Sequence, residues 1–260
     1  MTQSTGIRCN DLTLSYGHRV VSSGLNIAIP EGQFTAIVGP NACGKSTLLR
    51  SMVRLLEPDA GAIELRGRDI TSFKHKELAR LVGFLPQEAL APEGITVERL
   101  IARGRFPHQT LLSAWSVLDQ LAVTEAMSLA GVNELADRHV SALSGGQRQR
   151  VWVAMVLAQQ TDFLLLDEPT TFLDITHQYD LLRLLGRLRD EGRTVVAVLH
   201  DINQACRFAD HLIAMRDGEV VAQGNPGDVL DATLMQSVFE LGCQVLPDPV
   251  TGTPMVVADR

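Results

Sequence analysis

The N-terminal part of the chain alternates apolar and polar positions, which is typical of strands with one buried face. Apolar residues occupy nearly every second position from Ile7 to Leu14, and again from Leu25 to Ile29. A glycine-containing turn, Tyr16-Gly17-His18, lies between the two stretches. We therefore predict a pair of antiparallel strands at the start of the chain.

Farther along, the apolar runs become short and continuous, which indicates strands buried on both faces, as in a parallel sheet. The clearest runs are Phe34–Val38, Phe163–Leu166 and Thr194–Leu199. Shorter candidate strands are Ala62–Leu65, Leu81–Leu85, His211–Met215 and Val220-Val221. Helical spacing is present in Ser46–Leu56 and through Tyr179–Leu188. Strands that alternate with helices predict a doubly wound α/β core.

Between Thr96 and Gln160 the pattern changes, because apolar residues there recur every three or four positions with no strong strand among them. That period predicts helices with one buried face. We expect a single domain over residues 1–260. Its α/β core, with the antiparallel part, covers about 1–87 and 161–260, and a helical insert covers about 88–160.

The segment Gly39-Pro40-Asn41-Ala42-Cys43-Gly44-Lys45-Ser46 matches the phosphate-loop pattern G-x-x-x-x-G-K-[ST]. An apolar strand precedes it and the helical stretch from Ser46 follows it, as such a loop requires, and the expected ATP-binding segment extends to Thr47. Backbone N–H groups at the start of that helix favour an anion. We predict that the loop binds ATP, with Lys45 on the β- and γ-phosphates and the Ser46 hydroxyl on Mg²⁺.

Two carboxylates, Asp167 and Glu168, end the buried run Leu164-Leu165-Leu166. Buried carboxylates are costly unless they bind a cation or accept hydrogen bonds. We expect Asp167 to hold Mg²⁺, directly or through water, and Glu168 to act as general base for the attacking water. A solvated strand end is the alternative interpretation.

The segment Leu143-Ser144-Gly145-Gly146-Gln147 precedes an apolar helix and forms a second candidate anion site. Its hydroxyl and amides are suited to a γ-phosphate. The phosphate loop already supplies one cradle, so a second cradle suggests that each nucleotide is shared between two chains. We therefore expect Ser144, Gly145, Gly146 and Gln147 to bind the ATP of a partner chain.

Charge and composition limit the choice of partners. The formal net charge of −7 disfavours a protein that binds mainly nucleic acid. The four cysteines are scattered without metal-ligand spacing, and no N-terminal secretion signal is expected. The longest apolar runs fall short of the ~18–20 residues that span a bilayer. Any function at a membrane would therefore depend on a partner.

Together the three motifs resemble those of the ATP-binding subunits of ABC transporters, and the resemblance covers nearly the whole chain. It implies an ABC cassette of the P-loop NTPase class, with a parallel core sheet, an N-terminal antiparallel β subdomain and an inserted α-helical subdomain. It also implies a dimer of two copies that enclose ATP and Mg²⁺ at their interface.

The same resemblance assigns roles to four further residues. Tyr16 stacks on adenine, and Gln87 contacts Mg²⁺ and a permease. Asp174 belongs to the loop that links the two sites of a dimer, although it is also placed to cap the next helix. His200 contacts the γ-phosphate, so Lys45, Gln87, Glu168 and His200 form the expected catalytic set.

The sequence departs from the commonest family pattern at two positions. Ala42 stands where many members have glycine, which limits the backbone freedom of the phosphate loop. Phe172 replaces a small residue in the dimer loop. Neither change removes a catalytic group.

Three stretches beyond the phosphate loop and the acidic strand end look like those of importers for ferric siderophores, closest to the ferric-enterobactin type. They are Ala102–Gln109, Thr170–Ile175 and Val198–Ala205, which surrounds His200. The resemblance implies two transmembrane permease subunits, an indirect partnership with a periplasmic or lipoprotein substrate-binding protein, and a peripheral position on the cytoplasmic face of the inner membrane. Import of haem or vitamin B12, an exporter's cassette, and a soluble ABC ATPase of iron–sulfur cluster assembly are the alternatives.

The basic residues Arg99, Arg103 and Arg105 have several possible roles. Their charge suggests a phosphate site. Their position in the family favours a place near the groove that receives the permease. A solvated face is an interpretation of comparable weight. No nucleic-acid role is expected of them.

Overall fold

The computed structural model describes residues 5–109 and 115–259, and the chain divides into two compact units. The first unit consists of Met1–Phe73 and Leu185–Arg260, and the second of Lys74–Leu184. The predicted nucleotide-binding motifs are divided between these units. The phosphate loop lies in the first, and the acidic strand end and the Ser144 segment lie in the second.

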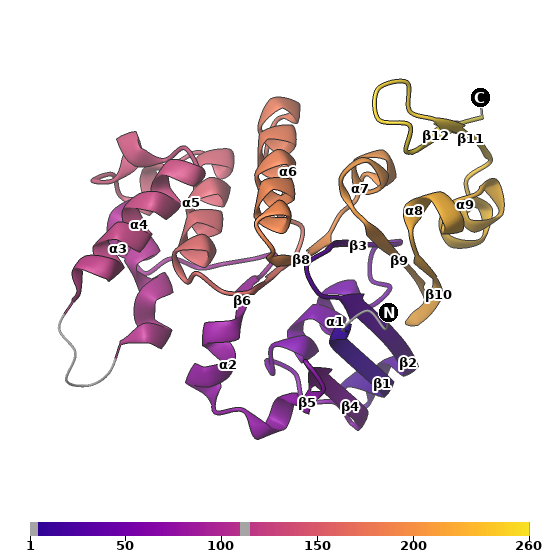
Figure 1. Ribbon diagram of the computed structural model, residues 1–260, viewed down its shortest axis with the longest axis horizontal. Helices are drawn as coiled ribbons and strands as arrows, with labels where there is room; N and C mark the ends of the chain where they lie inside the picture. The colour runs from indigo at the N-terminus through magenta and orange to yellow at the C-terminus, as the bar shows by residue number, and fades with distance from the viewer. Residues whose placement is uncertain (1–4, 110–114, 260) are drawn as a thin grey trace. The chain divides into compact units, whose positions relative to one another are not determined.

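An antiparallel sheet in the first unit confirms the strand pair predicted from the N-terminal alternation. β1 (Thr5–Tyr16) pairs with β2 (Arg19–Pro30) through a tight turn, and Tyr16 lies opposite Arg19. The strand order is β2-β1-β4-β5, with β4 at Ala60–Leu65 and β5 at Arg68–Asp69 (Figure 1). Gly17 has a φ of 59°, which glycine adopts without steric cost.

A second sheet in the first unit is parallel at its centre. β3 (Phe34–Val38) pairs in parallel with β8 (Thr194–Val198) and with β9 (His211–Arg216). β10 (Glu219–Gly224) adds an antiparallel edge. Every residue of β3 and β8 is buried, which explains why their sequences are continuously apolar. The helix α1 (Lys45–Met52) follows β3 across the phosphate loop.

Several elements near the C-terminus were not predicted. They are α7 (Ile202–Phe208), α8 (Pro226–Val229), α9 (Ala232–Phe239) and the antiparallel pair β11 (Cys243–Pro247) and β12 (Pro254–Ala258). Aspartates begin two of these helices. Asp201 accepts hydrogen bonds from the amides of Asn203 and Gln204, and Asp231 accepts one from Leu234. Such caps are a sequence signal for a helix start.

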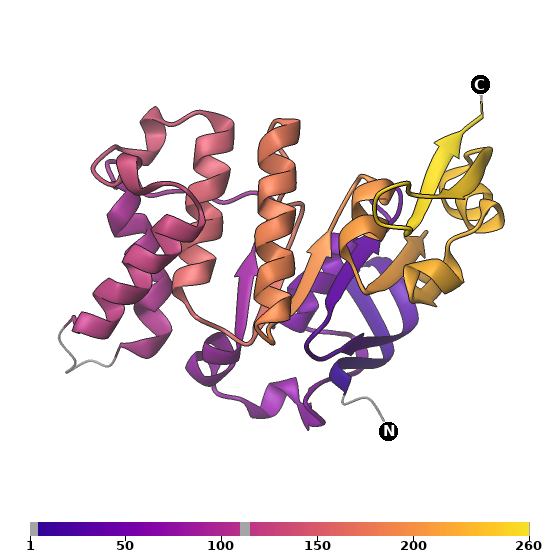
Figure 2. The same ribbon diagram turned by 45° about the horizontal axis from the view of Figure 1, so that its top comes forward.

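The second unit confirms the helical character of the chain between Thr96 and Gln160. Its helices α3 (Val97–Ala102), α4 (Val117–Leu129) and α5 (Gly145–Ala158) pack against one another (Figures 1 and 2). Short 3-10 turns connect them at Arg103–His108 (η2), Asn133–Leu135 (η3) and Val140–Ala142 (η4).

The second unit also contains a pair of parallel strands, β6 (Val82–Leu85) and β7 (Phe163–Leu166). Leu81 ends the preceding helix α2 (His75–Leu81) and does not begin the strand, so the predicted boundary was wrong by one residue. The first unit has a further short turn, η1 (Ile70–Ser72).

The boundary between the two units falls within the helix α6 (Ile175–Asp190). In residues 5–109 and 115–259, no helix combines the length and the apolar character that crossing a bilayer requires.

A buried ion pair joins three elements of the second unit. The guanidinium of Arg105 in η2 donates to Asp119 of α4 (Nε–Oδ1 2.9 Å) and to the carbonyl of Ala158 at the end of α5 (2.8 Å). Arg105 and Asp119 are only 6% and 7% exposed. The surface roles considered for Arg105 were therefore wrong, because its charge is used inside the fold.

The Asp119 carboxylate is well supplied with donors. The Ser116 hydroxyl donates to Asp119 Oδ2 (2.6 Å), and this bond, together with Arg105, lowers the pKa of Asp119 to about 2. Ser116 also accepts from the Asp119 amide, which completes a capping box at the start of α4. The ion pair with Arg105 therefore fixes the position of α4, and the capping box with Ser116 fixes the residue at which α4 begins.

We predict that Arg105→Ala lowers the free energy of unfolding by about 3–5 kcal/mol at neutral pH, because it leaves the Asp119 charge buried without its cation. Asp119 has a depressed pKa in the folded state. Its contribution is therefore present above the unfolded pKa of about 3.9 and is lost as the pH falls toward 2. The difference between the two proteins should shrink over that range in denaturant unfolding experiments.

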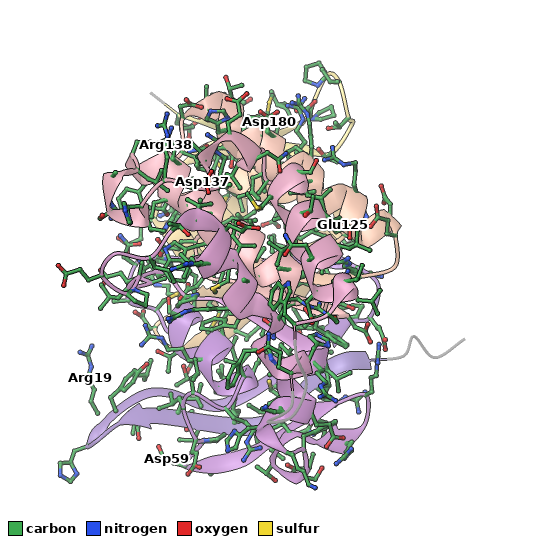
Figure 3. All side chains as sticks on the ribbon, turned by 90° about the vertical axis from the view of Figure 1, so that its left-hand side faces the viewer. Arg19, Asp59, Glu125, Asp137, Arg138 and Asp180 are labelled. Carbon is green, nitrogen blue, oxygen red and sulfur yellow. The ribbon has the colours of Figure 1, made fainter. Side chains whose placement is uncertain are left out.

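The exposed pair of Arg183 with Asp180, 3.3 Å apart on α6, gives a matched control (Asp180 is labelled in Figure 3). Arg183→Ala should cost no more than about 1 kcal/mol, since exposed ion pairs contribute little. Equal losses in the two variants would contradict a special role for the buried pair.

Candidate nucleotide site

The phosphate loop is held against neighbouring backbone at two points. Gly39 has a φ of 150°, and a Cβ there would lie 2.1 Å from the Met215 carbonyl oxygen, so only glycine fits. On the other side of the loop, the Gly218 amide donates to the Cys43 carbonyl (3.1 Å). The strands β9 and β10, which flank Gly218, thus fix the curvature of the loop.

Lys45 directs its ammonium group back over the loop. Its Nζ donates to the carbonyls of Gly39 (2.8 Å) and Pro40 (2.7 Å), and the residue is buried. A phosphate oxygen is a charged acceptor and makes a stronger hydrogen bond than a neutral carbonyl. The geometry therefore keeps a positive charge inside the cradle, ready for an anion.

Ala42 adopts the left-handed conformation, with a φ of 62°. This conformation costs an L-residue about 1–2 kcal/mol relative to the right-handed one. The substitution of alanine for the usual glycine is therefore tolerated with strain. Strain of this kind is common where a loop is shaped for a ligand.

Two further predicted residues lie in the same unit as the loop. The register of β3 and β8 pairs Ile37 with Val198, so Gly39 and His200, each two residues farther on, leave the sheet at the same edge. His200 is exposed there, just before α7. Tyr16 ends β1, is exposed, and accepts a long hydrogen bond from Arg50 of α1 (3.4 Å).

In the second unit, a similar register brings Gln87 and the acidic pair to one edge. Leu85 pairs with Leu166, and the Asp167 amide donates to the Leu85 carbonyl (2.9 Å). Asp167 is fully buried, whereas Gln87 is exposed. The second interpretation, a solvated strand end, is therefore wrong for Asp167.

Glu168 has a φ of 53°, which places a non-glycine residue in the left-handed region. Its carboxylate accepts a long hydrogen bond from the Thr171 hydroxyl (3.4 Å), and the Thr171 amide donates to the Glu168 carbonyl (3.2 Å). The turn formed by these bonds sets the direction in which the carboxylate leaves the strand. Backbone strain of this kind clusters at functional sites, although turns elsewhere in the chain, such as the one at Asp217, also contain it.

Ser144 caps the helix α5. Its hydroxyl accepts from the Gln147 amide (3.3 Å), and the Gln147 side chain accepts from the Ser144 amide (3.1 Å). Gly145 and Gly146 lie against Phe172, and a Cβ on Gly146 would come 3.2 Å from the Phe172 carbonyl oxygen. The first turn of the helix therefore carries no side chain at Gly145 and Gly146, and Ser144 and Gly145 are exposed, which suits an anion site.

Asp174 caps α6, since its carboxylate accepts from the His177 amide (3.0 Å). The cap that the sequence offered as an alternative is therefore confirmed. The role in a dimer loop stays a prediction, and the two roles are compatible. Beside it, Phe172 is 73% exposed with a φ of 66°.

Each unit contributes side-chain oxygens of the kind that Mg²⁺ binds. Mg²⁺ prefers hard oxygen ligands and usually retains waters and substrate phosphates among them. The Ser46 hydroxyl in the first unit is a ligand of that class, and so are the Gln87 amide oxygen and the buried Asp167 carboxylate in the second unit. Within the described parts of the chain, no cluster of three or more His, Cys, Asp or Glu side chains is arranged to hold a metal alone.

A groove of about 290 Å³ lies beside Gln87 in the second unit, and the sequence did not predict its walls. Leu90, which is almost fully exposed, and Phe172 contribute apolar surface. Arg148 and Trp152 line it from α5. The sequence signal was a single leucine, Leu90, within a loop rich in Pro, Ala and Glu. Whether that leucine is exposed cannot be read from the sequence.

Known proteins provide an independent comparison. A family model described as ABC transporter matches residues 22–171. The ferric enterobactin transport ATP-binding protein FepC of Escherichia coli (strain K12) is 54% identical over 259 residues, covering 99% of this chain and 96% of that protein. The probable siderophore transport system ATP-binding protein YusV of Bacillus subtilis (strain 168) is 49% identical, covering 97% and 92%.

Solved structures give the same result. A metal-chelate type ABC transporter in an inward-facing conformation matches with a TM-score of 0.83 and 26% identity, covering 99% of this chain and 98% of that one. A dimeric bacterial ABC transporter cassette matches with a TM-score of 0.76 and 30% identity, covering 84% and 98%.

Proposed function

This chain belongs to the ABC transporter family as an ATP-hydrolysing subunit, and we propose that it powers the import of a ferric siderophore through separate permease subunits. The observation that carries the cargo assignment is the end-to-end similarity to the ferric enterobactin protein of E. coli. A second relative named for siderophore transport supports it. These relatives favour siderophores over haem, vitamin B12 or iron–sulfur cluster assembly.

The catalytic roles follow from the chemistry of the side chains. Lys45 neutralises charge on the β- and γ-phosphates, and the amides of the phosphate loop bind the same oxygens. Glu168 accepts a proton from the attacking water, while Gln87 and His200 orient the γ-phosphate. Ser46, Gln87 and Asp167 would hold Mg²⁺, and the bound ion would neutralise negative charge on the phosphates. Tyr16 provides an exposed ring for the adenine.

Each nucleotide is shared by two copies of the chain. Ser144, Gly145, Gly146 and Gln147 of one copy bind the γ-phosphate held by the phosphate loop of the other. The exposed Ser144 and Gly145 at the N-terminus of α5 support this assignment. The dimeric form of the related bacterial cassette supports it as well. The shared anion draws the copies together, and its loss after hydrolysis releases them.

Transmission to the permease uses the groove beside Gln87. Its apolar walls and the guanidinium of Arg148 suit a short segment of another protein. Gln87 also contacts the nucleotide in this proposal. Movement of the loop that carries Gln87 therefore couples ATP hydrolysis to movement of the permease. The working assembly then contains two copies of this chain and two permease subunits at the cytoplasmic face of the membrane, with a substrate-binding protein on the other side.

The general base is tested by Glu168→Gln. We expect ATP binding to persist while turnover falls by about 10²–10⁴-fold, because the amide cannot accept the proton. Nucleotide binding and phosphate release, measured on the same preparation, separate the two effects. Glu125→Gln, on the exposed side of α4 (Figure 3), should hydrolyse ATP normally. Near-normal turnover by Glu168→Gln would exclude the role.

The shared site is tested by mixing two inactive variants. Lys45→Ala removes the phosphate cradle, and Ser144→Arg blocks the site offered to the partner. Each variant should be inactive alone. In a mixed dimer, the intact Lys45 of one chain faces the intact Ser144 of the other, so one of the two sites works. Each mixed dimer should therefore have up to half of the activity of a wild-type dimer. No recovery, with mixed dimers demonstrated by crosslinking, would contradict sharing.

The cargo is tested by deleting the gene in its own host and supplying defined iron sources. We expect growth on ferric siderophores to fail, and growth on haem and uptake of vitamin B12 to be unchanged. The wild-type gene should restore growth, and Glu168→Gln should not. Loss of haem use, or unchanged siderophore use, would overturn the cargo assignment while leaving the ATPase assignment intact.

A further inference from the structure

The second unit carries a hollow with both basic and aromatic walls. A depression of about 660 Å³ lies between α3, η2 and the residue two positions before α4, and its lining includes Arg99, Arg103, Phe106 and Trp115. Phe106 is 64% exposed and Trp115 is 44% exposed. Unlike Arg105, the two arginines lie at the surface.

The first turns of α4 extend this surface with exposed apolar side chains. Leu118 is 72% exposed, and Leu121, three residues on, lies on the same side of the helix. The opposite side of α4 is buried by the rest of the unit and contains Ala122 and Val123, so α4 has one buried and one exposed apolar face. The exposed face ends at Glu125, one turn after Leu121 (Figure 3).

We call this surface the basic–aromatic patch. It consists of Arg99, Arg103, Phe106, Trp115, Leu118 and Leu121.

The aromatic rings of the patch are held in place. The Trp115 indole donates to Gln120 (3.1 Å), and Gln120 donates in turn to Glu98 of α3 (3.0 Å). The Lys76 ammonium lies 4.8 Å from the centre of the Phe106 ring. Rings fixed before contact lose little conformational freedom on binding. These aromatic side chains are therefore exposed and ordered at the same time.

The charge of the patch is opposite to that of the whole chain. The formal net charge is −7, so most of the surface is repelled by an anionic partner. The patch itself contains two arginines and no acidic side chain, and Glu98 and Glu125 lie at its border. Tryptophan, phenylalanine and leucine beside arginine form the combination that binds the boundary between lipid headgroups and acyl chains.

We propose that the basic–aromatic patch binds the anionic lipid surface of the membrane. The arginines contact headgroup phosphates, and Trp115, Phe106 and the leucines enter the interfacial layer. The exposed aromatic and leucine side chains around the two arginines favour a lipid surface over an acidic protein segment, because an interfacial layer takes up apolar side chains as well as pairing with cations. The contact goes beyond the proposed ATPase function, because it needs neither nucleotide nor permease.

The test uses the purified full chain and vesicles without any permease. We expect the protein to co-sediment with phosphatidylcholine vesicles that contain phosphatidylglycerol, and not with phosphatidylcholine alone. Raising the salt should weaken binding, because it screens the arginines. The chain has two tryptophans, and Trp152 is buried. A blue shift on binding should therefore disappear in Trp115→Phe.

Substitutions locate the contact. Each arginine replaced by glutamine should weaken binding about five-fold, so the double variant Arg99→Gln/Arg103→Gln should lose roughly 25-fold. Leu118→Asp should weaken binding further. Arg138→Gln (Arg138 is labelled in Figure 3) and Leu55→Asp alter equally exposed residues elsewhere and serve as matched controls. Circular dichroism checks that every variant is folded.

Two results would overturn the proposal. One is binding to anionic vesicles that the patch variants do not weaken beyond the controls. The other is binding only to membranes that contain the permease, lost in the same variants, which would identify an acidic protein segment as the partner. Neither result bears on ATP hydrolysis, which is measured separately on the same proteins.

Discussion

Parallel pairing of buried strands is the constraint on which the site depends. Two polar residues that follow different strands come close together only when the two strands lie side by side and end at the same edge of the sheet. The pairing of Ile37 with Val198 does this for the phosphate loop and His200. The pairing of Leu85 with Leu166 does it for Gln87 and Asp167. A slip of one residue in either register would move a functional side chain by about 3.3 Å.

Much of this arrangement could be predicted from sequence, because backbone requirements are written in residue types. The phosphate loop needs glycine where its backbone touches Met215, and a buried strand needs an unbroken apolar run. The antiparallel pair at the N-terminus and the helices between Thr96 and Gln160 followed from periodicity alone. In each case one local property decides the structure.

The features that were missed depend on contacts between distant segments. Arg105 has the sequence context of a surface residue, but it is buried because Asp119 and the Ala158 carbonyl lie where its guanidinium reaches. The groove beside Gln87 likewise joins a loop to a helix some sixty residues away. The helices α7 and α9 were missed for another reason. They are short, so their aspartate caps were the main signal.

The hydroxyl of Ser144 has the chemistry for both the helix cap and the proposed contact with a partner's phosphate. A hydroxyl has lone pairs and a proton, and the two can be used independently. In this chain a lone pair is occupied by the Gln147 amide of the same helix. The proton is left to point elsewhere, toward any anion that approaches the helix end. An aspartate would cap the helix equally well but would repel a phosphate, and an alanine would do neither. Serine at this position is therefore compatible with both the helix cap and the phosphate contact that we propose.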